Sequence, residues 1–127
     1  MITITDVLHE LGISDYIVRG KPTNETEFNS MFVRVTAVDD LGNITEETNP
    51  ANFGVTWTEI SAKKTELENN ESLKLLRMHR NSKLAETDWW VLPDRTATDE
   101  QLAYRQALRD ITDTYSSLDD VVWPTKP

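Results

Sequence analysis

The chain of 127 residues contains no cysteine. Disulfide bonds, thiolate nucleophiles, zinc ribbons and iron–sulfur clusters are therefore excluded. Aromatic residues make up only 8% of the sequence and hydrophobic residues 38%, so we expect a thin core. A chain of this length forms one modest domain or two very small ones.

Positive charge is also scarce. The sequence has 13 Lys and Arg against 22 Asp and Glu, for a net charge of −9. A negative surface repels nucleic acids and anionic lipids, so neither nucleic acid nor membrane is an expected partner. No apolar run approaches the roughly 20 residues that span a bilayer. Residues 1–6 lack the basic start and apolar core of a signal peptide, so we expect a soluble protein made in a cytoplasm.

Residues that commonly carry out catalysis are few. His9 and His79 are the only histidines, they lie in separate segments, and neither has a carboxylate at metal-ligand spacing. The sequence also lacks a glycine-rich phosphate loop and a Gly-x-Ser-x-Gly motif. We therefore predict a protein that is not an enzyme, with solvent-facing histidines, no catalytic residue, no metal and no cofactor.

The pattern predicts an α+β fold, which begins with a small α+β unit over residues 1–55. Thr5 is the expected N-cap of a short helix that Gly12 ends. Asn24 is the expected N-cap of a second short helix that carries Phe28.

Two segments of this unit have the composition of strands. Residues 15–19 form the first, and residues 32–38 are rich in Val and other β-formers. Turn residues at 39–43 follow the second strand, and Ile44 resumes an apolar pattern. A β-hairpin is expected there.

Residues 56–86 predict a central helical connector. Thr56 and Glu59 have the spacing of a capping box at its start. Asn69 and Asn70 are weak helix formers, so we favour two helices, or one with a kink, over one straight helix. A broad set of leucines suggests that this region carries any homo-oligomer contact. The leucines are Leu67, Leu73, Leu76 and Leu84, and a basic face is formed by Lys74, Arg77, Arg80 and Lys83.

Residues 87–127 predict a helical, Trp-rich module that contains three of the four tryptophans. Thr98 and Gln101 have the spacing of a capping box, which starts a helix that ends near residue 112. Leu102, Leu108 and Ile111 are its expected apolar stripe. Residues 116–127 read as an extended tail.

Charge separates the two ends of the chain. Residues 1–70 carry 5 basic and 12 acidic side chains, whereas residues 71–127 carry 8 and 10. The change near Asn69 and Asn70 suggests two functional halves joined by helix.

The C-terminal half has an ordered set of rare residues. It contains Asp88-Trp89-(x)2-Leu92-Pro93-Asp94, then Tyr104-Arg105-(x)2-Leu108-Arg109-Asp110-Ile111, and then Val122-Trp123-Pro124. This pattern resembles the C-terminal module of phage tail assembly chaperone-like proteins, which is similar to modules that end tail-fibre assembly proteins. The resemblance covers residues from about 71 to 127. Family members usually carry a Gly-Phe-Pro-like stretch where this chain has residues 115–120.

Six side chains of this module are candidates for partner binding: Trp89, Trp90, Tyr104, Arg105, Arg109 and Trp123. The two arginines lie one helical turn apart, so they either clamp carboxylates of a partner or pair internally with Asp88, Asp94 or Asp110. Internal pairing is favoured because these acids are close in sequence. The tryptophans either form the core of the module or present an interaction hot spot, and one of the adjacent pair is expected to point away.

The resemblance implies a non-enzymatic protein associated with a bacteriophage tail or tail fibre. Such a protein acts as an assembly chaperone or as a minor structural component of the virion. Its expected partner is a tail or tail-fibre protein, met in the host cytoplasm during assembly, and the virion tail is a second possible location. The alternative is a phage regulatory or inhibitor protein that binds a host factor.

Overall fold

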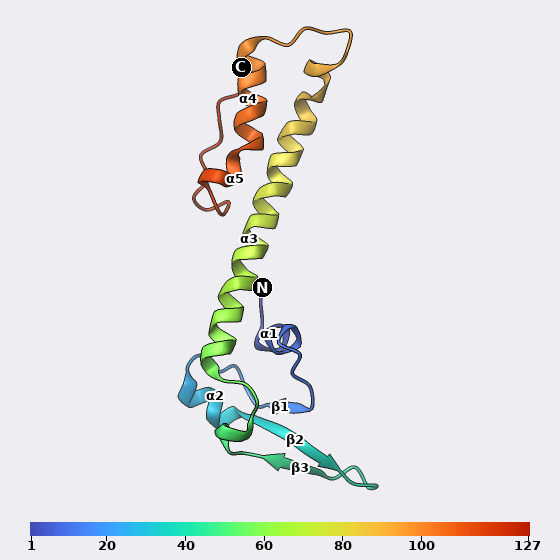
Figure 1. Ribbon diagram of the computed structural model, residues 1–127, viewed down its shortest axis with the longest axis vertical. Helices are drawn as coiled ribbons and strands as arrows, with labels where there is room; N and C mark the ends of the chain where they lie inside the picture. The colour runs from blue at the N-terminus through green and yellow to red at the C-terminus, as the bar shows by residue number, and fades with distance from the viewer. The chain divides into compact units, whose positions relative to one another are not determined.

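The computed structural model describes residues 1–127 and has the predicted α+β architecture (Figure 1). The chain divides into two compact units, Met1–Glu68 and Asn69–Pro127. Each unit has its own cluster of buried apolar side chains. The boundary lies beside Asn69 and Asn70, where the charge of the sequence changes.

The first unit begins with helix α1, Ile4–Glu10. Its N-cap is Thr3, so the prediction that Thr5 caps this helix is wrong. The Thr3 hydroxyl accepts a hydrogen bond from the Asp6 amide at 3.2 Å, and the Asp6 carboxylate accepts one from the Thr3 amide at 2.8 Å. This reciprocal capping box needs an acid three residues after the cap, which Thr3 has and Thr5 lacks. The amide of Thr3 also lowers the pKa of the Asp6 carboxyl, because it hydrogen-bonds to the charged form.

A three-stranded antiparallel sheet follows, with strand order β1-β2-β3. Its strands are β1 (Tyr16–Val18), β2 (Phe32–Val38) and β3 (Ile44–Glu47), so the predicted hairpin is confirmed. Asp39 holds the turn of the hairpin: its carboxylate accepts hydrogen bonds from the amides of Leu41 and Asn43 at 2.9 and 2.8 Å. These bonds lower the pKa of the Asp39 carboxyl, chiefly through Asn43.

Helix α2 (Glu25–Met31) brings Phe28 into an aromatic core, with Asn24 as the predicted N-cap. Phe32 of β2 and Phe53, which follows the short 3-10 helix η1 (Pro50–Asn52), complete this core. The ring centroids of Phe32 lie 4.8 Å from Phe28 and 4.9 Å from Phe53. All three phenylalanines of the chain are fully buried. Because aromatic side chains are large, their burial removes a large apolar area from water.

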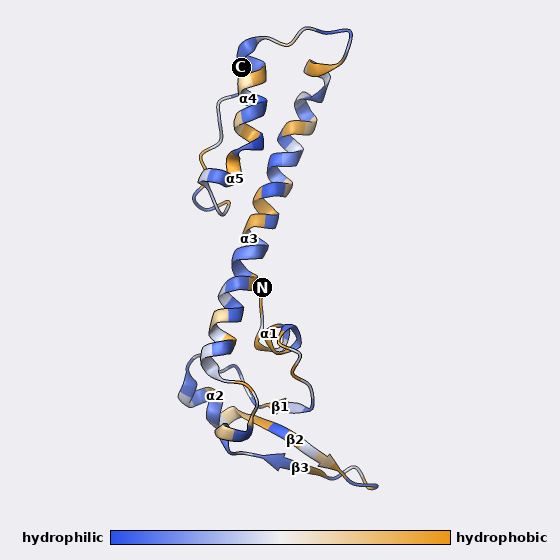
Figure 2. Ribbon diagram, in the orientation of Figure 1, coloured by the Kyte–Doolittle hydropathy of each residue, from blue (hydrophilic) through white to orange (hydrophobic).

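Helix α3 runs from Trp57 to Thr87 as one continuous helix of 31 residues. The predicted capping box at its start is confirmed, because the Thr56 hydroxyl accepts from the Glu59 amide at 3.2 Å and the Glu59 carboxylate accepts from the Thr56 amide at 3.3 Å. The prediction of two separate helices that meet at Asn69 and Asn70 is wrong. An asparagine costs a helix under about 1 kcal/mol relative to alanine, and neither glycine nor proline is present to end it. Figure 2 shows polar and apolar residues alternating along α3.

The second unit continues with the 3-10 helix η2 (Asp88–Val91), then helices α4 (Asp99–Arg109) and α5 (Ile111–Thr114). The capping box of Thr98 and Gln101 is confirmed.

Leu102 does not belong to the apolar stripe of α4, because its side chain is 46% exposed. Six residues separate it from Leu108, which turns it about 120° away, whereas Tyr104 lies only four residues before Leu108 and is buried. The tail also differs from a fully extended strand. A turn held by Asp120, whose carboxylate accepts from the Ser117 amide at 3.0 Å, precedes the extended residues 121–127.

The position of the α1 cap gives a direct test. Thr3→Ala should destabilise the first unit by about 1 kcal/mol, because the Asp6 amide loses its acceptor. Thr5→Ala is the matched control and should leave the unfolding midpoint in urea nearly unchanged. Equal effects of the two substitutions would contradict the assignment of Thr3 as the cap.

Candidate functional site

The core of the second unit is an aromatic and aliphatic cluster at the end of α3. Trp90, Tyr104 and Leu108 are buried in it, and their exposed fractions are 4%, 6% and 0%. The centroids of the Trp90 and Tyr104 rings are 6.0 Å apart. Burial raises the pKa of the Tyr104 hydroxyl, and the negative charge of Glu86 adds to the shift.

The two adjacent tryptophans point in different directions. Trp90 is buried, whereas Trp89 is 48% exposed, and their ring planes meet at 72°. Both lie in η2, where successive side chains diverge by about 120°. The Trp89 indole donates a hydrogen bond to the Glu86 carbonyl at 3.1 Å, which fixes the orientation of the exposed ring. The expectation that one of the pair points away therefore describes the structure.

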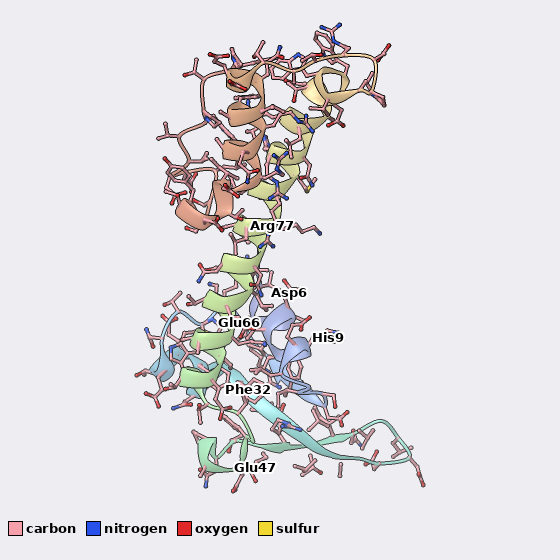
Figure 3. All side chains as sticks on the ribbon, turned by 45° about the horizontal axis from the view of Figure 1, so that its top comes forward. Asp6, His9, Phe32, Glu47, Glu66 and Arg77 are labelled. Atoms are coloured by element: carbon pink, nitrogen blue, oxygen red, sulfur yellow. The ribbon has the colours of Figure 1, made fainter.

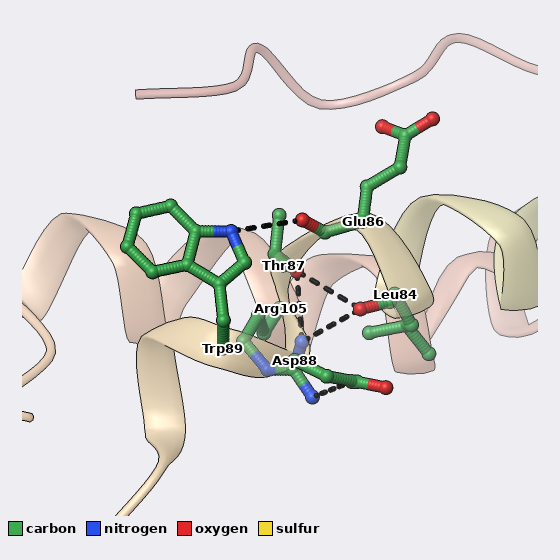
Figure 4. A network of polar contacts seen from close by, with 6 residues as sticks. All are labelled: Leu84, Glu86, Thr87, Asp88, Trp89 and Arg105. Carbon is green, nitrogen blue, oxygen red and sulfur yellow. Dashed lines mark hydrogen bonds and ion pairs between the residues drawn. The ribbon is translucent and has the colours of Figure 1, made fainter. Parts of the chain in front are cut away.

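Arg105 ties α4 to the last turn of α3 (Figure 4). Its Nη1 donates to the Leu84 carbonyl at 2.9 Å and to the Thr87 hydroxyl at 2.7 Å. Its Nη2 pairs with the Asp88 carboxylate at 2.9 Å, and only 11% of the side chain is exposed. Arg105 thus makes the internal pairing that the sequence favoured, with Asp88 as its acid.

Arg109 is engaged differently. Its Nη2 donates to the Gln106 side chain at 2.8 Å, and the side chain is exposed. Gln106 in turn donates to both oxygens of Asp110 at 3.0 Å. The two arginines therefore do not form a matched pair of free guanidinium groups, although Arg109 remains accessible.

Trp123 anchors the tail against the buried cluster, as predicted. The Lys83 ammonium lies 4.9 Å from the Trp123 ring centroid, within the range of a cation–π contact. Lys126 lies 5.9 Å from the Trp90 ring centroid and 4.0 Å from the Glu86 carboxylate. The tail is thus held by one aromatic anchor and two cations.

An apolar surface remains exposed on the turn after α3. Trp89, Val91 and Leu92 are 48%, 46% and 47% exposed, and we call these three residues the η2 patch. The guanidinium carbon of Arg95 lies 4.3 Å from the Trp89 ring centroid. These three large apolar side chains lie within four consecutive residues. They therefore form a local apolar cluster, unlike single apolar residues that are scattered over a surface.

Residues 73–127 match the family model of the phage tail assembly chaperone protein. The match confirms the resemblance carried by the Trp, Arg and Pro residues of this module. It covers residues 73–87 of α3 together with η2, α4, α5 and the tail. Neither the curated proteins nor the solved structures contain a match to the chain.

The chaperone family suggests a non-enzymatic role. His9 and His79 are both exposed, and they lie in different units; His9 is labelled in Figure 3. No group of three His, Asp or Glu side chains is arranged to hold a metal ion. None of the helices has the length and hydropathy that crossing a membrane requires.

Four contacts of this site were missed at the level of sequence. They are the Thr87 hydroxyl and Leu84 carbonyl that bind Arg105, and the two lysines, Lys83 and Lys126, that lie against tryptophan rings. The sequence around Thr87 contains one signal that could have predicted its contact. It follows Leu84 by three residues at the end of an apolar face, where a polar residue is buried only if it has a partner.

Arg105 and Arg109 should differ in their effects on stability. Arg105→Ala leaves the buried Thr87 hydroxyl without a donor, so the free energy of unfolding should fall by about 1–3 kcal/mol. Arg109→Ala, one turn away, should change it by less than about 0.5 kcal/mol. Urea denaturation followed by circular dichroism measures both, and similar losses would contradict the structural role of Arg105.

The anchoring of the tail by Trp123 gives a second test. Trp123→Ala should lower stability by at least about 2 kcal/mol, toward the lower end of the cost of truncating large buried aromatics. Amide hydrogen exchange of residues 116–127 should rise at the same time, because an unanchored terminus frays. Val122→Ala is the control, since Val122 is 69% exposed. If the Trp123 variant melts and exchanges like the parent, Trp123 is not an anchor.

Proposed function

We propose that this chain acts in phage tail assembly by binding a tail or tail-fibre polypeptide through residues 71–127. The family match supports a role in the assembly of a phage tail. The observation that carries the proposal is the η2 patch, because it is the place in the matched module where a large aromatic side chain stays exposed. The protein acts by contact and not by catalysis.

The η2 patch has the properties of a binding hot spot. An exposed tryptophan beside two aliphatic side chains offers a large apolar area to a partner. Buried Trp90 lies within the same turn, and the Trp89 indole is hydrogen-bonded to Glu86, so the patch is held in one conformation before binding. Preorganisation of this kind lowers the entropy cost of association.

Charge favours a selective contact. The chain as a whole is acidic, with a net charge of −9, which limits nonspecific association. Arg95, stacked on Trp89, places a cation at the edge of the apolar patch. The expected partner surface is therefore apolar, with a carboxylate at its border to pair with Arg95.

Two modes of action fit this contact, an assembly chaperone and a minor component of the virion. We favour the chaperone, because the family match carries that description. Mass spectrometry of purified virions separates the two, since a chaperone leaves the particle and a structural component remains at fixed stoichiometry.

The η2 patch can be tested in the full chain. The double variant Trp89→Ala/Leu92→Ala, affinity-tagged and expressed during infection by the phage, should recover at least tenfold less of a tail or tail-fibre protein, identified by mass spectrometry, than the parent. Leu41→Ala is the matched control, because Leu41 is an apolar residue of the first unit that is 88% exposed. Undiminished recovery by the double variant, or a loss with Leu41→Ala alone, would refute binding through the η2 patch.

A further inference from the structure

We propose that a second copy of this chain docks antiparallel against an exposed stripe on the C-terminal half of α3. The stripe consists of Leu75, Met78, Ser82 and Ala85 of α3 and of Trp89 in η2, just beyond the end of the helix, and we call it the outer stripe. All five residues are exposed, and the three large ones, Leu75, Met78 and Trp89, are 44%, 55% and 48% accessible. The inference concerns self-association and does not depend on the function proposed above.

The spacing of the outer stripe is that of a helix–helix contact. Its members follow one another by three, four, three and four residues, which is the a/d pattern of a heptad repeat. At 100° per residue its four members in α3 are centred on the side of the helix away from Leu76 and Thr87, both of which are fully buried. α3 is therefore apolar on two sides, and the fold of its own unit covers only one of them.

The charges beside the stripe favour a second copy as the occupant. Lys74 stands at the N-terminal end of the stripe, and Glu86 and Asp88 stand at its C-terminal end. Glu86 and Asp88 pair with Lys126 and Arg105 within the chain, yet their side chains are still 61% and 64% exposed, so both remain accessible to a further cation. An antiparallel pair brings each Lys74 to the acidic end of the other copy, whereas a parallel pair sets like charges side by side. The surface is thus self-complementary in one orientation, as a twofold interface requires.

The sizes of the side chains favour the same orientation. Ser82 and Ala85 are small and lie near the middle, so two helices can approach closely there. In the antiparallel pair, Leu75 and Met78 of one copy lie toward Trp89 of the other, and each end of the contact receives both aliphatic and aromatic side chains. In the parallel pair the two Trp89 rings would meet at one end.

Sedimentation velocity of the full chain tests the association. The parent should show a dimer whose fraction rises with concentration up to the high micromolar range. Met78→Asp places a charge within the stripe and should weaken the dimer at least about tenfold. Leu102→Asp is the matched control, because Leu102 is an exposed apolar residue of α4 outside the stripe, and it should leave the dimer unchanged. A strictly monomeric parent, or equal weakening by both variants, would overturn the proposal.

Cross-linking tests the orientation, because the chain has no cysteine of its own. With the twofold axis near Ser82, a Ser82→Cys variant should form a covalent dimer with a short bismaleimide. Leu75→Cys should not, since its two copies lie about 20 Å apart along an antiparallel pair of helices.

Arg77→Cys, on an exposed position of α3 outside the stripe (Figure 3), is the control for random collision. Cross-linking at Leu75→Cys equal to that at Ser82→Cys indicates a parallel pair and would overturn the orientation. Cross-linking at Ser82→Cys no stronger than at Arg77→Cys would overturn the contact itself.

Discussion

The contact of Arg105 with the end of α3 is the constraint on which the C-terminal module depends. The last carbonyls of a helix have no partner within the helix, and the helix dipole favours a cation beside them. Arg105 supplies that cation and binds the Leu84 carbonyl, the Thr87 hydroxyl and Asp88 together. The chain after Thr87 therefore tightens into η2, and this turn places Trp90 inside the module and Trp89 outside it.

Local signals in the sequence predicted much of the fold. The capping boxes at Thr56 and Thr98 and the turn at 39–43 each appear where the pattern places them, because each depends on side chains within four residues of the backbone that they bind. The errors have equally local causes. Only Thr3 has an acid three residues later, so Thr3 and not Thr5 caps α1, and the penalty of two asparagines is too small to break α3.

The candidate site was harder to predict, because its contacts join distant parts of the chain. Arg105 meets Leu84 across 21 residues, and several acids stood equally close in sequence, so the choice of Asp88 required the packing of α4 on α3. Which tryptophan is exposed also depends on the 3-10 geometry of η2, and two adjacent identical residues carry no pattern that distinguishes them. The sequence thus predicted which residues belong to the site, but not which acid pairs with Arg105 or which tryptophan is exposed.

The two proposals meet at Trp89, which belongs both to the η2 patch and to the outer stripe. One indole ring cannot be buried against two occupants at once, so a tail polypeptide that binds the η2 patch must compete with a second copy of the chain for Trp89. By mass action, dimerisation would then lower the apparent affinity for the tail protein as the concentration of the chain rises. A self-contact of this kind keeps an apolar patch out of water while no partner is present, which suits a protein whose aromatic surface is otherwise an aggregation hazard. Two contacts that share one side chain cannot form together, which is compatible with transient binding during assembly.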